Sequence, residues 1–214
     1  MKKEVKKSLL NSMFSSRKAT FVSLTVFLSV LLIVGVLLFF FWDRQKEPVD
    51  GIYYYPADYS ADIFQNVAYT TFTRDLLYGA GGVEQLFNYE MDLESSSAEC
   101  KFFLRYFHSV IYGEYEKIGE FYVDGFFEEK PKFTMQMVYD PYVLYHSAIK
   151  ETIDGKEETI YNFHVRYRIF KNNGTFRKGV ASGEAVPQIY QLIKDAEGNY
   201  RIYRILEIEF KDVD

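Results

Sequence analysis

The sequence predicts an α+β fold in which a single N-terminal transmembrane helix is followed by helices packed on a bent four-stranded antiparallel sheet. Three observations lead to this fold class. Residues 21–42 carry no charge, apolar side chains recur at helical spacing as far as about residue 140, and the spacing changes to alternation after Tyr142. Helices followed by a run of strands are typical of an α+β domain.

The uncharged run at residues 21–42 is long enough to cross a membrane. Twenty-two helical residues span about 33 Å, against a hydrocarbon core of about 30 Å. A cleavable signal peptide has a shorter apolar core and small residues at its cleavage site, whereas this run ends in the bulky sequence FFFW. We therefore expect a retained signal anchor, with Trp42 at the membrane interface.

The charges on either side of this run predict its orientation. Residues 1–20 hold six basic side chains and one acidic side chain, and positive charge stays on the cytoplasmic side. Residues 43–214 hold nineteen basic and twenty-nine acidic side chains, which argues against a nucleic-acid partner. We expect a single-pass protein of the cell membrane, with a cytoplasmic N-terminus and an extracytoplasmic C-terminal domain.

Composition and periodicity divide the chain into five segments. These are a basic cytoplasmic tail (1–20), the transmembrane helix (21–42), a juxtamembrane linker (43–60), an additional helical segment (61–94) and an extracytoplasmic domain (95–214).

Helices are expected in the first half of the outer part. Apolar residues at helical spacing predict one from Asp62 to the glycines that begin at Gly79. The strongest pattern begins with Ser97 as N-cap and ends at Gly113. We expect a shorter helix at 114–123 and another after Thr134 that ends near Pro141.

Four strands are expected after Tyr142, separated by the turn signals Asp154-Gly155, Asn173-Gly174 and Gly198-Asn199. Asn173-Gly174-Thr175 is also a glycosylation sequon, but a hairpin turn is the preferred interpretation. In the second strand, alternation predicts one face on the core. The residues expected on that face are Tyr161, Phe163, Val165, Tyr167 and Ile169.

The later turns imply two different registers in the third strand. A two-residue turn at Asn173-Gly174 pairs Val165 with Ser182, whereas one at Gly198-Asn199 pairs Ile189 with Ile208. Both hold only if the strand shifts by an odd number of residues between them. We therefore expect a bulge and a sharp bend near Gly183–Pro187.

This order of elements resembles the nuclear transport factor 2-like superfamily, the cystatin-like cone shared with ketosteroid isomerases. The resemblance covers roughly residues 97–210 and is carried by FFLRYFHSVIYGEYEKIGEFY and by the hairpin series that ends in YRIYRILEIEF. With its short tail and single span, the chain is also similar to assembly factors of conjugation and type IV secretion systems. The fold hosts enzymes, binding modules and assembly domains, so function must be argued from the site.

The resemblance to isomerases implies a carboxylate base and a hydroxyl donor inside the cone. Glu184 is the candidate carboxylate, with Tyr161 or Tyr167 as its hydroxyl neighbour. A bulge beside Glu184 would turn it outward, and we favour a structural role for it.

No cofactor and no metal site are expected. A two-residue loop at Asp154-Gly155 places His146 opposite Phe163 and away from His164, whereas a three-residue loop brings the two histidines together. Either arrangement lacks the third ligand of a catalytic zinc site. Cys100, the only cysteine, is expected to be a buried, inert thiol, with pairing between chains as the alternative.

The outer face of the sheet is the candidate interaction surface. A basic stripe is expected there, beside the small residues of the third strand, and it consists of His164, Arg166, Arg168 and Arg201. Such a stripe could dock an acidic helix or a second copy, although solvated sheet faces show the same pattern.

Together these observations predict a membrane-anchored protein-docking or assembly module of the bacterial cell envelope, and not an enzyme. Its expected partners are the membrane, other envelope proteins or a second copy. The alternative is an anchored small-ligand-binding or ketosteroid-isomerase-like catalytic cone. A cone interior filled with aromatic side chains favours docking, whereas an open cavity with converging polar groups favours the alternative.

Overall fold

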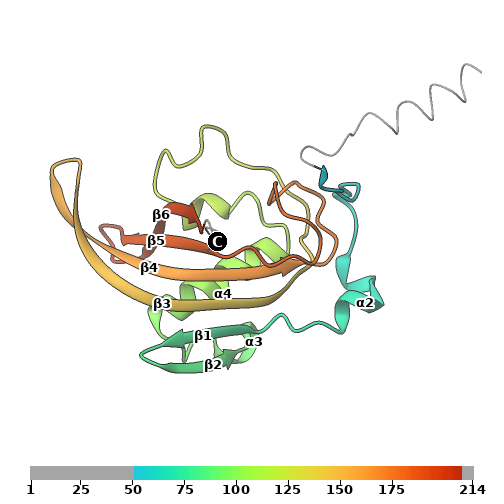
Figure 1. Ribbon diagram of the computed structural model, residues 1–214, viewed down its shortest axis with the longest axis horizontal. Coiled ribbons are helices and arrows are strands. Elements are labelled where there is room, and N and C mark those ends of the chain that lie inside the picture. Colours follow the sequence, from blue (N-terminus) through green and yellow to red (C-terminus); the bar gives the residue numbers. More distant parts are fainter. Residues whose placement is uncertain (1–50, 209–214) are drawn as a thin grey trace, which may run out of the picture. The chain divides into compact units, whose positions relative to one another are not determined.

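The structure, a computed structural model, describes residues 51–208, which form a curved six-stranded sheet with one long helix against it (Figure 1). The strands lie in the order β2-β1-β3-β4-β5-β6. Their bounds are Leu76–Ala80 (β1), Val83–Phe87 (β2), Val138–Ile153 (β3), Lys156–Ile169 (β4), Gln188–Lys194 (β5) and Tyr200–Glu207 (β6).

Helices are few in the described part of the chain. The long helix is α4 (Ala98–Ile111), and the others have three or four residues. They are η2 (Ile63–Gln65), α2 (Val67–Thr70), α3 (Tyr89–Asp92) and η3 (Ile118–Phe121). No helix within residues 51–208 has the length and apolar character needed to cross a bilayer. The span expected at residues 21–42 lies outside the described residues.

The expected four-stranded antiparallel sheet is wrong, because the sheet has six strands and is mixed. The two additional strands, β1 and β2, form a hairpin at Gly81-Gly82, where both residues have positive φ. A glycine pair allows this tight turn. The hairpin joins the sheet through β1, which runs parallel to β3. The segment 61–94, expected to be helical, therefore contributes a sheet edge.

Three expected helices are replaced by shorter or extended structure. The one from Asp62 is limited to η2 and α2, because β-branched threonines follow and the chain enters β1 at Leu76. The one at 114–123 is reduced to η3, which has no side-chain cap. The segment after Thr134 extends into β3, and Pro141 lies within that strand.

Helix α4 confirms the strongest helical prediction. The Ser97 hydroxyl accepts a hydrogen bond from the Cys100 amide at 3.3 Å, as an N-cap does. The helix ends before Gly113, whose φ is +68°. A Cβ at this position would lie 2.7 Å from the Met135 backbone nitrogen, so only glycine fits there.

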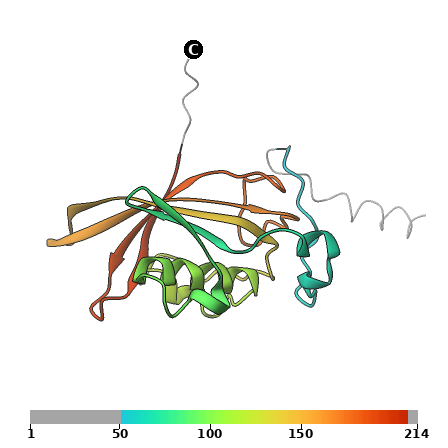
Figure 2. The same cartoon turned by 90° about the horizontal axis from the view of Figure 1, so that it is seen from below.

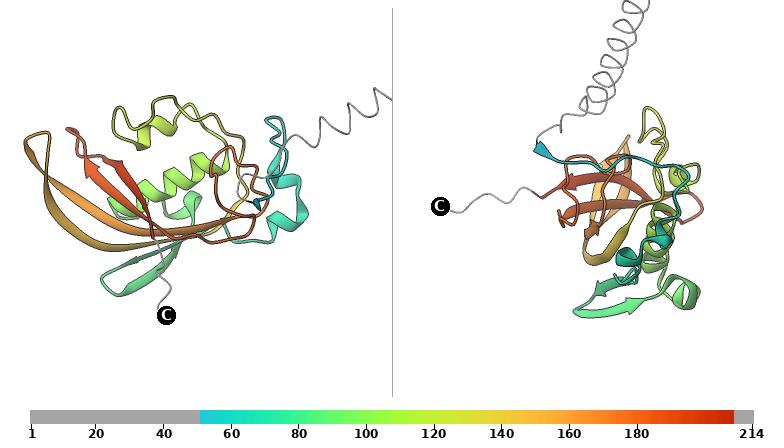
Figure 3. Two further views of the ribbon diagram at one scale, coloured as in Figure 1. Left: turned by 45° about the horizontal axis from the view of Figure 1, so that its top comes forward. Right: turned by 90° about the vertical axis from the view of Figure 1, so that its right-hand side faces the viewer.

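The β3–β4 hairpin confirms the Asp154-Gly155 turn, since Ile153 pairs with Lys156. β3 is irregular at two places, between Tyr139 and Tyr142 and between Tyr145 and Ser147. Bulges bend a strand and increase its twist. The long hairpin is strongly curved in Figure 1 and in the left view of Figure 3.

The expected hairpin at Asn173-Gly174 is wrong. Residues 170–187 form a loop, because the Asn173 carboxamide bonds to Thr134 and Thr175 and fixes a local turn. This loop lies beside the start of the described chain (Figure 3, right). There the Tyr54 hydroxyl accepts a hydrogen bond from the Gly179 amide.

The register expected for the last two strands is also wrong. β5 begins only at Gln188, which pairs with Val165, and the loop between β5 and β6 has five residues. Ile189 therefore pairs with Leu206 and not with Ile208. Gly183–Pro187 lies in the loop before β5, and the register shift of β5 occurs between Gln191 and Leu192.

The core lies between α4 and the sheet face that it covers, and the helices lie on that side (Figure 2). Phe163, Val165, Tyr167 and Ile169 are buried there, as the alternation in β4 predicts. Cys100 and the apolar stripe of α4 are buried against them.

Candidate functional site

The interior, which we define as the space between α4 and the sheet, is filled with aromatic side chains. Phe103 of α4 packs edge to face on Phe163 of β4, with 5.0 Å between ring centroids. Nearby, the buried Tyr106 hydroxyl lies 3.1 Å from that of Tyr122 and 3.3 Å from that of Tyr190. The three hydroxyls therefore satisfy one another, as buried polar groups must.

The buried tyrosines do not supply a base. Burial raises the pKa of Tyr106 and of Tyr167 well above the ordinary value, and it raises that of Tyr190 to about 12. The buried Arg177 guanidinium lies 4.9 Å from the centre of the Tyr167 ring and donates to the Val186 carbonyl at 2.8 Å. The buried tyrosines stabilise the core and keep their protons at neutral pH.

The predicted catalytic set is not brought together. Tyr167 is buried beside Arg177, whereas Tyr161 is half-buried and packs on Tyr200 at 5.2 Å. Glu184 is exposed on the loop before β5, where its carboxylate accepts a hydrogen bond from the Ala181 amide. Glu184 does face solvent, but a loop places it there and not the expected bulge.

The face of the sheet opposite α4, which we call the far face, carries a continuous row of paired residues. Side chains of paired residues point to the same side. One row crosses all six strands and consists of Glu84, Gly79, Leu144, His164, Ile189 and Leu206. The Leu144 side chain packs over Gly79, because a Cβ at Gly79 would lie 2.8 Å from the Cδ1 atom of Leu144. Leu206 remains 43% exposed at one end of the row.

A second row of the far face combines aromatic and charged groups. The Arg166 guanidinium lies 4.6 Å from the centre of the Tyr142 ring, and the Tyr142 hydroxyl donates to Glu84 at 2.8 Å. Arg166 is exposed, and so is Arg168, which pairs with Tyr139 on the next strand. The far face therefore presents apolar and cationic side chains together.

The bulge in β3 brings His146 beside His164, with 4.8 Å between ring centroids. This places the two histidines together even though the Asp154-Gly155 loop has two residues. Burial and the neighbouring imidazole lower the pKa of His164. Within residues 51–208, no group of three or more histidine, cysteine or acidic side chains is arranged to hold a metal ion.

Arg201 does not belong to the same stripe. Its Nε donates to Asp195 of the β5–β6 loop at 2.9 Å, and its side chain lines a pocket beside α4. The small residues expected opposite the stripe lie in the loop before β5. The predicted surface is therefore reduced to His164, Arg166 and Arg168 and is extended by Leu144, Ile189 and Leu206.

One feature was not predicted from the sequence. His108 is stacked between Tyr89 and Tyr112, with centroid distances of 3.8 and 4.3 Å, beside a pocket of about 410 Å³. Burial lowers the pKa of His108. His108 on α4 and Tyr112 at its C-cap are four residues apart in the sequence, but the contribution of Tyr89 depends on the tertiary fold.

Cys100 is fully buried, and burial raises the pKa of its thiol to about 12. It is therefore an inert core residue, as predicted.

Searches of family models, curated proteins and solved structures found no match to this chain.

Proposed function

We propose that this chain is a single-pass membrane protein of the bacterial cell envelope whose outer domain docks a protein partner through the far face of its sheet. The filled interior carries this proposal. Phe103, Phe163 and the linked hydroxyls of Tyr106, Tyr122 and Tyr190 occupy the space in which a small-molecule ligand would sit. The isomerase-like alternative is not favoured, because Glu184 is exposed on the loop before β5 and bonds to the Ala181 amide.

The far face has the chemistry of a docking surface. Interface centres combine apolar side chains with aromatic residues and arginine. Here Leu144, Ile189 and Leu206 form the apolar part, while Arg166 stacked on Tyr142 supplies a cation. The cation can steer an acidic partner, and the apolar row can be desolvated on binding.

The membrane part of the proposal rests on the uncharged run at residues 21–42 and on its basic flank. A tether of this kind raises the effective concentration of a partner in the same membrane, so weak contacts suffice. The similarity to conjugation and type IV secretion assembly factors, and to the nuclear transport factor 2-like superfamily, stays a prediction.

The test is chemical cross-linking in intact membranes, followed by purification of the full-length protein and identification of the attached chains. Combining the charge reversals Arg166→Glu and Arg168→Glu should abolish cross-linking of those chains, while membrane insertion and folding persist. The matched control is the double variant Lys150→Glu and Lys156→Glu at the tip of the β3–β4 hairpin, which should keep them.

Retention of the partners by the far-face variant would contradict the proposal. So would the loss of an activity or of small-molecule binding in Glu184→Gln while the charge reversal has no effect.

A further inference from the structure

A pocket of about 320 Å³ lies between the first half of α4, η3 and the β5–β6 loop. Three buried aromatic side chains line it, and we call them its floor: Phe102, Phe121 and Tyr200. Phe102 is in contact with both other rings, with centroid distances of 5.7 Å to Phe121 and 6.5 Å to Tyr200. The floor is thus a packed apolar surface.

Three cations and one carboxylate also line this pocket, and we call them its rim: Lys101, Arg105, Arg201 and Glu120. Lys101 and Arg105 are four residues apart on α4 and therefore lie on one face of the helix. Residues 51–208 as a whole hold sixteen basic and twenty-three acidic side chains. The three cations of the rim therefore lie close together on a domain that is acidic as a whole, although Glu94 and Asp195 pair with two of them.

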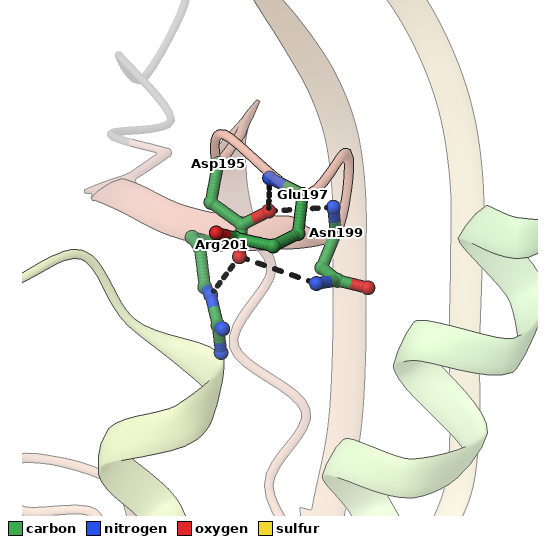
Figure 4. Close-up of polar contacts among 4 residues, drawn as sticks. All are labelled: Asp195, Glu197, Asn199 and Arg201. Carbon is green, nitrogen blue, oxygen red and sulfur yellow. Dashed lines mark hydrogen bonds and ion pairs between the residues drawn. The ribbon is translucent and has the colours of Figure 1, made fainter.

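Arg201 is held in place by the β5–β6 loop (Figure 4). Asp195 accepts hydrogen bonds from the backbone amides of Glu197 at 3.1 Å and Asn199 at 2.7 Å, which fixes its carboxylate. The other oxygen of Asp195 accepts from Arg201 Nε at 2.9 Å. The two terminal nitrogens of Arg201 make no hydrogen bond with another residue of the described chain and remain available for a ligand.

The two cations on α4 are also available. Within residues 51–208, Arg105 forms no ion pair. Lys101 pairs with Glu94 at 3.1 Å, but the Glu94 side chain is 84% exposed. Ion pairs in such exposed positions are weak and are readily exchanged.

We propose that this pocket binds an acidic peptide segment of a partner protein. A carboxylate of the segment forms a paired contact with the terminal nitrogens of Arg201. Further acidic side chains are attracted by Arg105 and Lys101. An adjacent aromatic side chain of the segment covers the floor. The aromatic floor favours a peptide over a simple phosphate, which has no apolar part. The inference rests on the proposed function only in that the occupant is a protein segment, because the pocket shares no residue with the far face.

The experiment is fluorescence anisotropy with the purified full-length protein and the labelled hexapeptide acetyl-EFEDFE. The comparison peptide is the neutral analogue acetyl-QFQNFQ. The acidic peptide should bind at least about tenfold more tightly, and Arg201→Gln and Arg105→Gln should each weaken its binding about tenfold, as loss of a charge-assisted hydrogen bond does. Added salt should weaken binding.

Lys156→Gln removes one positive charge at the hairpin tip and is the matched control, which should bind as the unchanged protein does. Equal binding of the two peptides, or full binding by Arg201→Gln with an intact fold, would overturn the inference. Binding of inorganic phosphate or of vesicles containing anionic lipid in place of the peptide would also overturn it. The peptide-binding assay contains no partner protein, so its result is independent of the cross-linking test of the far face.

Discussion

The two faces of the sheet satisfy their polar groups in different ways. On the face toward α4, the hydroxyls of Tyr106, Tyr122 and Tyr190 bond to one another in a buried aromatic core. On the far face, Arg166 and the imidazoles of His146 and His164 are accessible beside a row of apolar side chains. The first arrangement stabilises the fold, and the second leaves groups available for a partner.

The largest expected effect is on the face toward α4. Truncating the fully buried Phe163 to alanine should lower the free energy of unfolding by about 3–5 kcal/mol, because the lost ring leaves a cavity beside Phe103 and Tyr145. Urea unfolding of the purified protein measures this. Leu206→Ala on the far face is the comparison, and its cost should be much smaller because Leu206 is already 43% exposed. Equal costs would mean that the two faces are assigned wrongly.

A smaller effect is expected from Tyr106→Phe, which keeps the ring and removes the hydroxyl that links Tyr122 and Tyr190. The loss leaves buried hydroxyls short of a partner and should cost about 1–2 kcal/mol in the same unfolding experiment. Tyr112→Phe at the C-cap of the same helix is the matched control, since Tyr112 is 44% exposed. An unchanged midpoint for Tyr106→Phe would show that the hydroxyl network contributes nothing.

The pH dependence of stability tests the burial of His108. The pKa of His108 is lowered in the folded protein, mainly by burial. The unfolded chain therefore takes up a proton first, so stability is full above the ordinary value of about 6.5 and falls as the pH drops below it. Thermal unfolding between pH 7.5 and 5 should show a steeper loss for the unchanged protein than for His108→Phe, which keeps the stack. Parallel pH profiles for the two proteins would show that His108 does not contribute to the pH dependence of stability.

The smallest effect on stability belongs to the docking surface. Arg166→Ala should change the free energy of unfolding by less than about 0.5 kcal/mol, because the side chain is exposed and its stacking on Tyr142 is solvated. Unfolding in urea measures this change as well. A cost of several kcal/mol would place Arg166 in the structural core.

The sequence predicts those features that depend on local pattern. The cap at Ser97, the stop at Gly113 and the alternation of β4 follow from residue types and spacing, and the structure confirms each. The Asp154-Gly155 turn belongs to the same group, since both residues adopt the positive φ that the dipeptide favours.

The failures have a common physical cause, which is tertiary contact. Asn173-Gly174 has the composition of a hairpin turn, but the Asn173 side chain bonds to Thr134, and the Tyr54 ring lies against Gly174. The glycines near residue 80 stop a helix or turn a hairpin equally well, and only the parallel pairing with β3 selects the hairpin. The proximity of His146 and His164 likewise depends on a bulge that no dipeptide marks.

Photo-cross-linking in living cells tests most directly whether the far face docks a partner. A benzophenone amino acid placed at Leu206 reports on that face, and one placed at Met91, which is 78% exposed on α3, reports on another surface. We expect a specific cross-link from position 206 to an envelope protein or to a second copy. This cross-link should be lost when Arg166→Glu and Arg168→Glu are added to the same protein. Cross-links of equal yield from both positions, or none from position 206, would contradict it.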